Sequence, residues 1–399
     1  MKILQRSFVI FLLGIVSDTC IDPYLPHLDH NEQLLVVDGL LTNEEHSCTV
    51  ILSRTKAEKD LPPVMVSGAV VTIGEIKGPV TELQETGNGV YSADSIAFRG
   101  EVGKTYLLRI NTTDGKTYES DPCMMYPSGR IDSIHFEKDI EILNSRNEVQ
   151  DGLRFFIDCE VSSDCRYYRW DYEEWWKFKV PNVARYEFIN ENDIRPIYNV
   201  KEICWKHDTG DPIVTQFVEE AQSDKIENKP FMFIPSGISD RFLIRYCIEI
   251  RQLSISQNEY EFWSQMRKVG DSGGNIFDIQ PFPVVSNIHN VNNIDEPVLG
   301  YFKVSAAERK RFYISRSDLA GLGLKVYLYD CEEIPLDISS HHFSSFDNLY
   351  NFWAANYPSY AFIKPVYERG SLVKLVFAKK ECTDCSLTGS LSEPDFWTD

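Results

Sequence analysis

Three carboxylates within four residues are the most direct candidates for catalysis in this chain. Asp171, Glu173 and Glu174 lie in the aromatic run from 166 to 180, and a pair of acids on opposite sides of a cleft performs the acid and base steps of glycoside hydrolysis. Here the acids follow one another along one strand, and no opposing acid can be identified. The chain also lacks the G-x-S-x-G, H-E-x-x-H and G-x-x-x-x-G-K-S/T motifs. The sequence therefore predicts no catalytic residue, and we expect a protein that is not an enzyme.

Trp175 is the residue of the same run that is best suited to bind a ligand. If the run is a strand, its alternate residues fall on opposite faces. One face is then apolar and consists of Tyr168, Trp170, Tyr172, Trp176, Phe178 and Val180. Trp175 lies on the other, charged face, where an exposed ring can stack on a sugar or anchor a protein partner. A bulge that flips the register would instead bury Trp175, and the sequence leaves both alternatives open.

Cys382 and Cys385 form a C-x-x-C motif. A tetrahedral zinc site needs four ligands, and no second Cys or His pair of matching spacing stands nearby. A redox dithiol needs a thioredoxin-like βαβ context, which is absent from the pattern. We therefore expect structural disulfides, either between these two cysteines or from each to a separate one. The pair His341 and His342 and the oxygen-rich stretch 287–296 are better explained by loops and turns, so no metal site is predicted.

The first twenty residues have the pattern of a targeting segment. Lys2 and Arg6 precede an apolar run over residues 8–16, which is long enough for a signal-peptide core and too short to cross a bilayer. Cys20 follows at the place where bacterial lipoproteins receive a thioether-linked diacylglycerol, although Ser17 stands where such signals usually have leucine. We expect residues 1–19 to be cleaved and Cys20 to carry this covalent lipid, with no other cofactor. Cleavage to a soluble secreted protein is the alternative.

The composition narrows the choice of partners. The chain has 60 Asp and Glu residues against 40 Lys and Arg residues, with a formal net charge of −20. Such a protein repels phosphate backbones, and no basic run offsets the overall field, so nucleic acid is excluded as a partner. Ten cysteines include nine after Cys20. Export permits disulfides, and the odd number leaves at least one thiol unpaired.

Short strands dominate the rest of the chain. Residues 20–32 contain two prolines and no periodic apolar pattern, which is typical of an extended tether, here a lipidated one. Residues 33–122 contain short β-branched or aromatic runs separated by Gly, Pro, Asn and Asp, and this spacing predicts an immunoglobulin-like β-sandwich. Residues 123–399 are again β-rich and end with the C-x-x-C tail. The predicted fold class is mostly β, with a second β-sandwich-like domain behind the first.

Two helical insertions are expected in the second domain. Ser256 followed by Glu259 forms a capping box, and basic residues precede Gly270, so a helix is predicted between these points. A second helical stretch is predicted over residues 346–356.

Several stretches of the chain, in this order, match one known family. They are CIDPY (20–24), LVVDGLLTNE (35–44), SQNEYEFWSQM (256–266), GGNIFDIQP (273–281), VLGYFKVSAAERKRFYI (298–314) and CTDCSLTGSLSEPDFW (382–397). With these stretches the chain resembles the domain of unknown function 4249 family, whose members are lipoproteins of Bacteroidota outer membranes. The resemblance implies a signal with a lipid, an immunoglobulin-like first domain and genetic association with TonB-dependent outer-membrane transporters. It implies no catalytic residues.

These observations together predict a function. We expect an outer-membrane lipoprotein that is a non-enzymatic accessory or binding subunit of an outer-membrane β-barrel complex, with a TonB-dependent transporter as partner. The lipid holds it on the membrane, and the extracellular face is favoured over the periplasmic one. Two alternatives are a freestanding surface lipoprotein that binds glycan or protein, with Trp175 as a contact, and a surface hydrolase.

Overall fold

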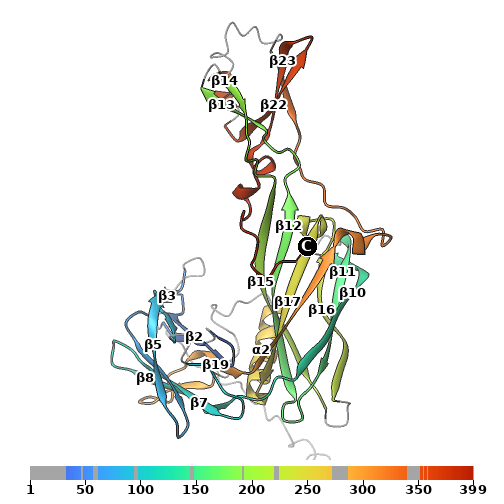
Figure 1. Cartoon of the computed structure of the whole chain (residues 1–399). Coiled ribbons are helices and arrows are strands. Elements are labelled where there is room, and N and C mark those ends of the chain that lie inside the picture. Colours follow the sequence, from blue (N-terminus) through green and yellow to red (C-terminus); the bar gives the residue numbers. More distant parts are fainter. Residues whose placement is uncertain are drawn as a thin grey trace, which may run out of the picture.

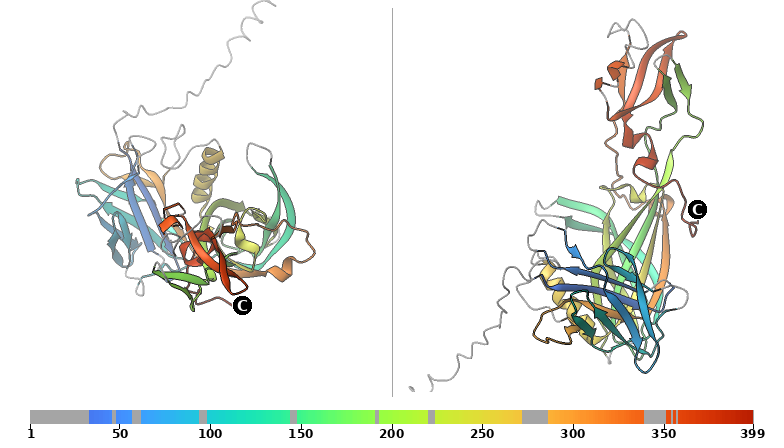
Figure 2. Two further views of the ribbon diagram at one scale, coloured as in Figure 1. Left: turned by 90° about the horizontal axis from the view of Figure 1, so that it is seen from above. Right: turned by 90° about the vertical axis from the view of Figure 1, so that its left-hand side faces the viewer.

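The described residues of the protein form three β units. The computed structural model describes residues 33–45, 48–56, 62–93, 98–143, 148–190, 193–219, 224–271, 286–338, 351–353, 355–356 and 358–398. The N-terminal unit, an 11-stranded sheet around one core that is called the sandwich below, lies beside the lower part of a central unit of long strands. A smaller upper lobe projects from the other end of the central unit (Figure 1). The side view in Figure 2 shows the same extended arrangement. The predicted mostly β fold class is confirmed.

The N-terminal sandwich is built from short strands. They are β1 (Leu35–Thr42), β2 (Cys48–Arg54), β3 (Val64–Met65), β4 (Val70–Glu75), β5 (Val80–Gly87), β6 (Val90–Ser92), β7 (Thr105–Asn111), β8 (Thr117–Ser120) and β9 (Cys123–Met124). Alternate residues point into one core, as Tyr106, Leu108 and Ile110 of β7 do. This period of two is the signal that predicts a half-buried strand.

Two later strands complete this sandwich, so the predicted boundary at residue 122 is wrong for them. β18 (Ile288–Asn290) pairs with β8, and β19 (Leu299–Ser305) pairs in parallel with β1. Phe302 of β19 is fully buried in the sandwich core. At Gly300 a Cβ atom would lie 2.0 Å from the Val37 carbonyl oxygen, so only glycine permits the close approach. A local pattern predicts a strand, but not which sheet the strand joins.

The central unit consists of two sheets of long antiparallel strands. One sheet has the order β10 (Arg130–Leu143), β11 (Glu148–Glu160) and β16 (Lys225–Pro235), and the other has the order β15 (Ile203–Phe217), β12 (Tyr167–Lys179), β17 (Arg245–Ile255) and β20 (Ala307–Ser315). The core between them contains many aromatic side chains. β10 approaches β20, where Lys310 Nζ donates to the carbonyl oxygen of Asp132 at 2.8 Å. This contact brings the two sheets towards a barrel. Short helical turns η2 (Asp240–Phe242) and η3 (Arg316–Leu319) follow β16 and β20.

The predicted helix after Ser256 is α2 (Gln257–Asp271), which packs on β12 and β15. The Ser256 hydroxyl accepts from the Glu259 N–H at 3.1 Å, as expected of an N-cap. Phe262, Trp263 and Met266 are buried against neighbouring strands. Of the second predicted helix, residues 351–353 and 355–356 are helical, and the rest lies outside the described residues. No helix among the described residues is long and apolar enough to cross a membrane.

The upper lobe is a unit of its own, so the range 123–399 is not one sandwich-like domain. Its strands are β13 (Tyr186–Asn190), β14 (Asp193–Pro196), β21 (Ile334–Asp337), β22 (Tyr360–Glu368) and β23 (Ser371–Lys379), followed by η4 (Lys380–Cys382) and η5 (Cys385–Leu387). Leu336, Phe362, Leu375 and Phe377 form a core separate from that of the central unit. The chain enters the lobe twice, between β12 and β15 and again after β20. Sequence spacing alone gives no sign of such a split.

Candidate functional site

Strand β12 has the two faces that its sequence predicts. It pairs with β17 without interruption from Tyr167 to Lys177. The predicted apolar face lines the central core, where Trp170 and Phe178 are almost fully buried. The pairing with β15 shifts between Trp170 and Tyr172, but the extra residues lie on β15. The register of β12 is therefore not flipped, and Trp175 lies on the charged face.

Other parts of the chain cover the Trp175 ring. The His207 ring stacks on it, with centroids 4.8 Å apart and an interplanar angle of 21°. Phe396 from the C-terminal tail contacts it edge-on at 4.7 Å. The tail is held there because Tyr313 Oη donates to the Phe396 carbonyl oxygen at 3.0 Å and the Arg311 guanidinium lies 3.9 Å from the centre of the Phe396 ring. Trp175 is thus half-buried without a bulge, and it is part of an aromatic cluster.

The three carboxylates of β12 do not converge on one site. Asp171 accepts from Arg251 Nε at 2.8 Å and from Arg251 Nη2 at 2.7 Å. Glu173 lies 3.3 Å from His207 Nε2. Glu174 points to the opposite side of the sheet. There it is buried and accepts from Arg241 Nη2 at 2.6 Å and from the Tyr246 hydroxyl at 2.8 Å. Each acid has its own base or donor, and no catalytic pair is formed.

The charged face of the central sheet also contacts the N-terminal sandwich. Glu44, which follows β1, bonds to Arg309 and lies 3.5 Å from Arg251. Glu249 of β17 accepts from Arg309 Nη1 at 2.7 Å and pairs with Arg311 at 2.6 Å. Although burial lowers the pKa of Arg309, its bonds to Glu44 and Glu249 hold that pKa above its usual value. We call this set of charges the junction network, with Glu44, Arg169, Asp171, Glu173, Glu249, Arg251, Arg309 and Arg311 as members.

A second charged contact lies at the base of this face, under α2. Arg169 stacks on the Trp263 ring at 4.3 Å, and the Trp263 indole N–H donates to Glu259 at 3.2 Å. Glu259 is only 2% exposed. Burial raises its pKa to about 7, although Arg169 and Lys303 act in the opposite direction. Because Lys303 belongs to β19, the sandwich, α2 and β12 all meet at this point.

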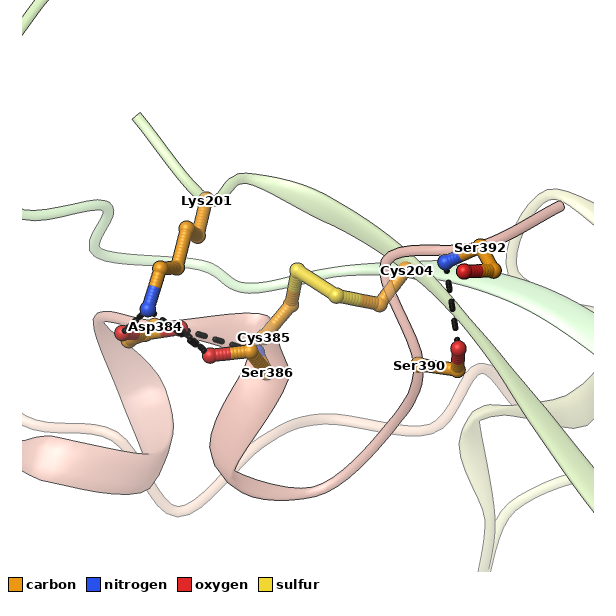
Figure 3. The surroundings of a disulfide bond; sticks show 7 residues. All are labelled: Lys201, Cys204, Asp384, Cys385, Ser386, Ser390 and Ser392. Atoms are coloured by element: carbon orange, nitrogen blue, oxygen red, sulfur yellow. Dashed lines mark hydrogen bonds and ion pairs between the residues drawn. A yellow bond between two sulfur atoms is a disulfide. The ribbon is translucent and has the colours of Figure 1, made fainter. Parts of the chain in front are cut away.

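The C-x-x-C cysteines do not pair with each other. Cys385 bonds to Cys204 at the start of β15, and Cys382 bonds to Cys331 before β21. Figure 3 shows the first bridge, beside which Lys201 pairs with Asp384 at 3.1 Å. Of the two predicted alternatives, the structure has the one in which each cysteine pairs with a separate partner. Five cysteines are free among the described residues: Cys48, Cys123, Cys159, Cys165 and Cys247.

Two surface cavities lie beside the elements described above, and the first is surrounded mainly by polar groups. One of about 420 Å³ lies at the edge of the three-stranded sheet, next to Asp132, Asp158, Lys225 and Asn228. Asp158 there accepts from the Ser133 hydroxyl and from the Asn228 N–H. Another of about 200 Å³ lies beside α2. These hydrogen-bonded groups resemble ordinary surface polar contacts more than a catalytic constellation.

The remaining predicted sites have different outcomes. No group of three or more His, Cys, Asp or Glu side chains in the described parts of the chain is arranged to hold a metal ion. In the oxygen-rich stretch, Glu296 pairs with Lys116 at 2.9 Å and Asn290 donates to Glu296, which builds a turn. His341 and His342 lie outside the described residues. Cys20 also lies outside them, so its lipid stays a prediction.

The sequence did not predict which residues cover Trp175, nor which basic residues pair with the carboxylates of β12. His207 and Arg309 are far from β12 in the sequence and have no motif of their own. Phe396 lies in the P-x-F-W segment that belongs to the family pattern. That segment was the available signal, since a large aromatic residue in a polar tail usually needs a surface to pack on.

The fold and the charged face of the central sheet define a β protein of several units. Ion pairs join the sandwich to the lower part of the central unit, and disulfides hold the chain at its upper part, where the lobe begins. The family described as domain of unknown function (DUF4249) matches residues 21–311. This match covers far more than half of the 399 residues, and the chain therefore belongs to that family. It ends within β20, before the strands β21 to β23 of the lobe. No curated protein matches the chain.

Proposed function

We propose that this protein is an exported, lipid-anchored accessory subunit of an outer-membrane β-barrel complex, and that it acts by binding rather than by catalysis. The observation that carries the proposal is the fixing of three β units into one extended body. Ion pairs join the sandwich to the central unit, and the Cys204–Cys385 bridge ties the C-terminal tail to the central unit just below the lobe. Such a body holds its end surfaces at fixed positions, which is what an assembly subunit needs.

The disulfides support export. Cys204 and Cys385 are 181 residues apart, and Cys331 and Cys382 are 51 residues apart. Bridges of this kind form and persist outside the reducing cytosol. They agree with the signal-like segment over residues 1–19 and with lipid attachment at Cys20.

The arrangement of the candidate site favours an accessory subunit over a glycan-binding surface protein and over a surface hydrolase. A sugar-binding platform needs an open aromatic face, whereas the Trp175 ring lies between His207 and Phe396. A glycoside hydrolase needs two carboxyl groups aimed at one bond. Asp171 and Glu174 point to opposite sides of the sheet and each is bonded to an arginine.

A lipid at Cys20 would keep the body close to membrane neighbours. The thirteen residues from 20 to 32 reach at most about 45 Å when extended. Confinement at this distance raises the effective concentration of the protein towards barrels in the same membrane. By the family resemblance, a TonB-dependent transporter on the outer membrane is the proposed partner, and the proposed location is the extracellular face.

The test is purification from native membranes in mild detergent with a tag at the C-terminus. We expect an outer-membrane β-barrel to co-purify in a stable ratio, and the Cys20→Ala variant to leave the membrane fraction and lose that barrel. The Cys123→Ser variant is the matched control for loss of a cysteine and should behave like the natural chain. Recovery of the natural protein only alone or self-associated, at native abundance, would reject the proposal.

A further inference from the structure

The far end of strand β10 is an open edge of the central unit. β11 is the strand partner of β10, and the described residues supply no partner strand on its other side. Near its start, β10 is closed against β20 by Lys310. In the middle, Lys138 Nζ donates to the carbonyl oxygens of Leu322 and Gly323. Beyond Lys138, the N–H of Ile140 is bonded by the neighbouring Asp139 carboxylate at 2.7 Å. An added strand would replace this local bond, and the outer backbone groups of an edge strand are a template for such pairing.

The inner face of this edge is apolar and exposed. Ile140 is 60% exposed, Ile142 is 61% exposed, and Val149, directly opposite Ile142 on β11, is 54% exposed. These side chains lie on the same face of the strands as Phe136, which packs against the core, but they lie beyond the end of that core. Three adjacent aliphatic side chains on a strand pair form an apolar patch, unlike the single exposed residues found on most surfaces.

The outer face of the same edge carries excess negative charge. Glu137, Asp139 and Glu141 alternate along β10, and Arg154 of β11 is the base beside them, at 2.6 Å from both Asp139 and Glu141. Three carboxylates against one guanidinium leave a formal charge of −2. A second copy of this chain, paired edge to edge, would place these acids against each other, which is unfavourable. Charge complementarity therefore favours a basic partner.

We propose that the edge of β10 from Asp139 to Ile142 binds an extended strand of a partner protein in which basic and apolar residues alternate. Backbone hydrogen bonds of the added strand provide affinity. Its apolar side chains cover Ile140 and Ile142, and its basic side chains face Asp139 and Glu141. This inference rests on the proposed binding function, but not on the lipid anchor or on the identity of the barrel.

The test uses the purified chain without its signal and a labelled synthetic peptide of about ten residues that alternates Lys and Val. We expect saturable binding in fluorescence anisotropy and protection of the amides of residues 139–142 from hydrogen exchange. Ile140→Lys should weaken binding about fivefold or more, because an apolar cross-strand contact is lost and a like charge is added. Val80→Lys, at another highly exposed aliphatic residue in the sandwich, is the matched control and should bind as the natural chain does.

Several results would overturn this inference. They are equal binding of a Glu–Val alternating peptide, undiminished binding by the Ile140→Lys variant, and protection that maps away from β10. If the barrel co-purifies with the Ile140→Lys variant as well as with the natural chain and the peptide does not bind, the edge is not the docking site and the proposed function stands. If the peptide protects β10 but no barrel co-purifies, the edge assignment stands and the proposed barrel partner is wrong.

Discussion

The two junctions of the central unit are held by different chemistry. At the lower junction, the sandwich meets the central sheet through charges, with Glu44 between Arg309 and Arg251. At the upper junction, the Cys204–Cys385 and Cys331–Cys382 bridges hold the tail and the segment before β21 where the lobe begins. Ion pairs respond to salt and pH, whereas disulfides respond to redox conditions. The comparison therefore predicts that each junction can be weakened without the other.

The largest effect is expected at the upper junction. Replacing Cys204 and Cys385 together by Ser removes a cross-link that spans 181 residues. Loop-closure entropy predicts a loss of about 5 kcal/mol in the free energy of unfolding. Denaturant unfolding should show the loss, and limited proteolysis should cut first near the lobe. Cys123→Ser changes a free thiol and should cost far less. A double variant as stable as this control would show that the bridge does not hold the junction.

The lower junction is tested by Arg309→Met. Glu249, which is 6% exposed, would lose one of its two arginine partners, and Glu44 would lose its closest one. Because 34% of the Arg309 side chain is exposed, we expect about 2 kcal/mol of destabilisation, less than for a fully buried pair. Added salt should weaken the natural lower junction and affect this variant less. An unchanged salt dependence of unfolding would contradict the assignment of the network to the junction.

A pH effect of similar or smaller size is expected from Glu259. Its pKa rises from 4.5 to about 7 in the folded protein, because burial penalises the charged form. Between pH 4.5 and 7 the native state binds more protons than the unfolded state. The contribution of Glu259 to the free energy of unfolding is therefore fully present below pH 4.5 and is lost as the pH rises through 7. Glu259→Gln should raise stability at pH 8 by about 1–2 kcal/mol and flatten the pH dependence in that window. An equal slope in both proteins would place the titration elsewhere.

The smallest effect is expected from the aromatic cluster. Trp175→Ala removes the stacked contact with His207 and the edge contact with Phe396. We expect a loss of about 1 kcal/mol, with faster hydrogen exchange in the tail near residue 396. A Trp175→Phe variant retains an aromatic ring and should lose less. If Trp175→Ala instead abolishes binding to a glycan while the tail stays protected, the ring is a ligand contact and not a support for the tail.

The residue pattern was sufficient for features that depend on neighbours along the chain. The two faces of β12 follow from a period of two, and helix α2 follows from Ser256 and Glu259 with apolar residues on one side. The structural role of Cys382 and Cys385 follows from the absence of a second ligand pair. The half-burial of Trp175 did not follow from the residue pattern, because the residues that cover it come from β15 and from the tail.

Local periodicity by itself determined that this protein is mostly β, where its longest described helix lies and which residues of β12 enter a core. The reason is that burial of one face of a strand or helix leaves a regular repeat of apolar residues in the sequence. Tertiary structure alone decided that β19 completes the sandwich next to β1, that Cys385 bonds to Cys204, and that Glu44 neutralises Arg309. These partners are 181 to 265 residues apart. Over such distances the contacts depend on how whole sheets pack, because no repeat in the sequence records which distant surface a side chain will meet.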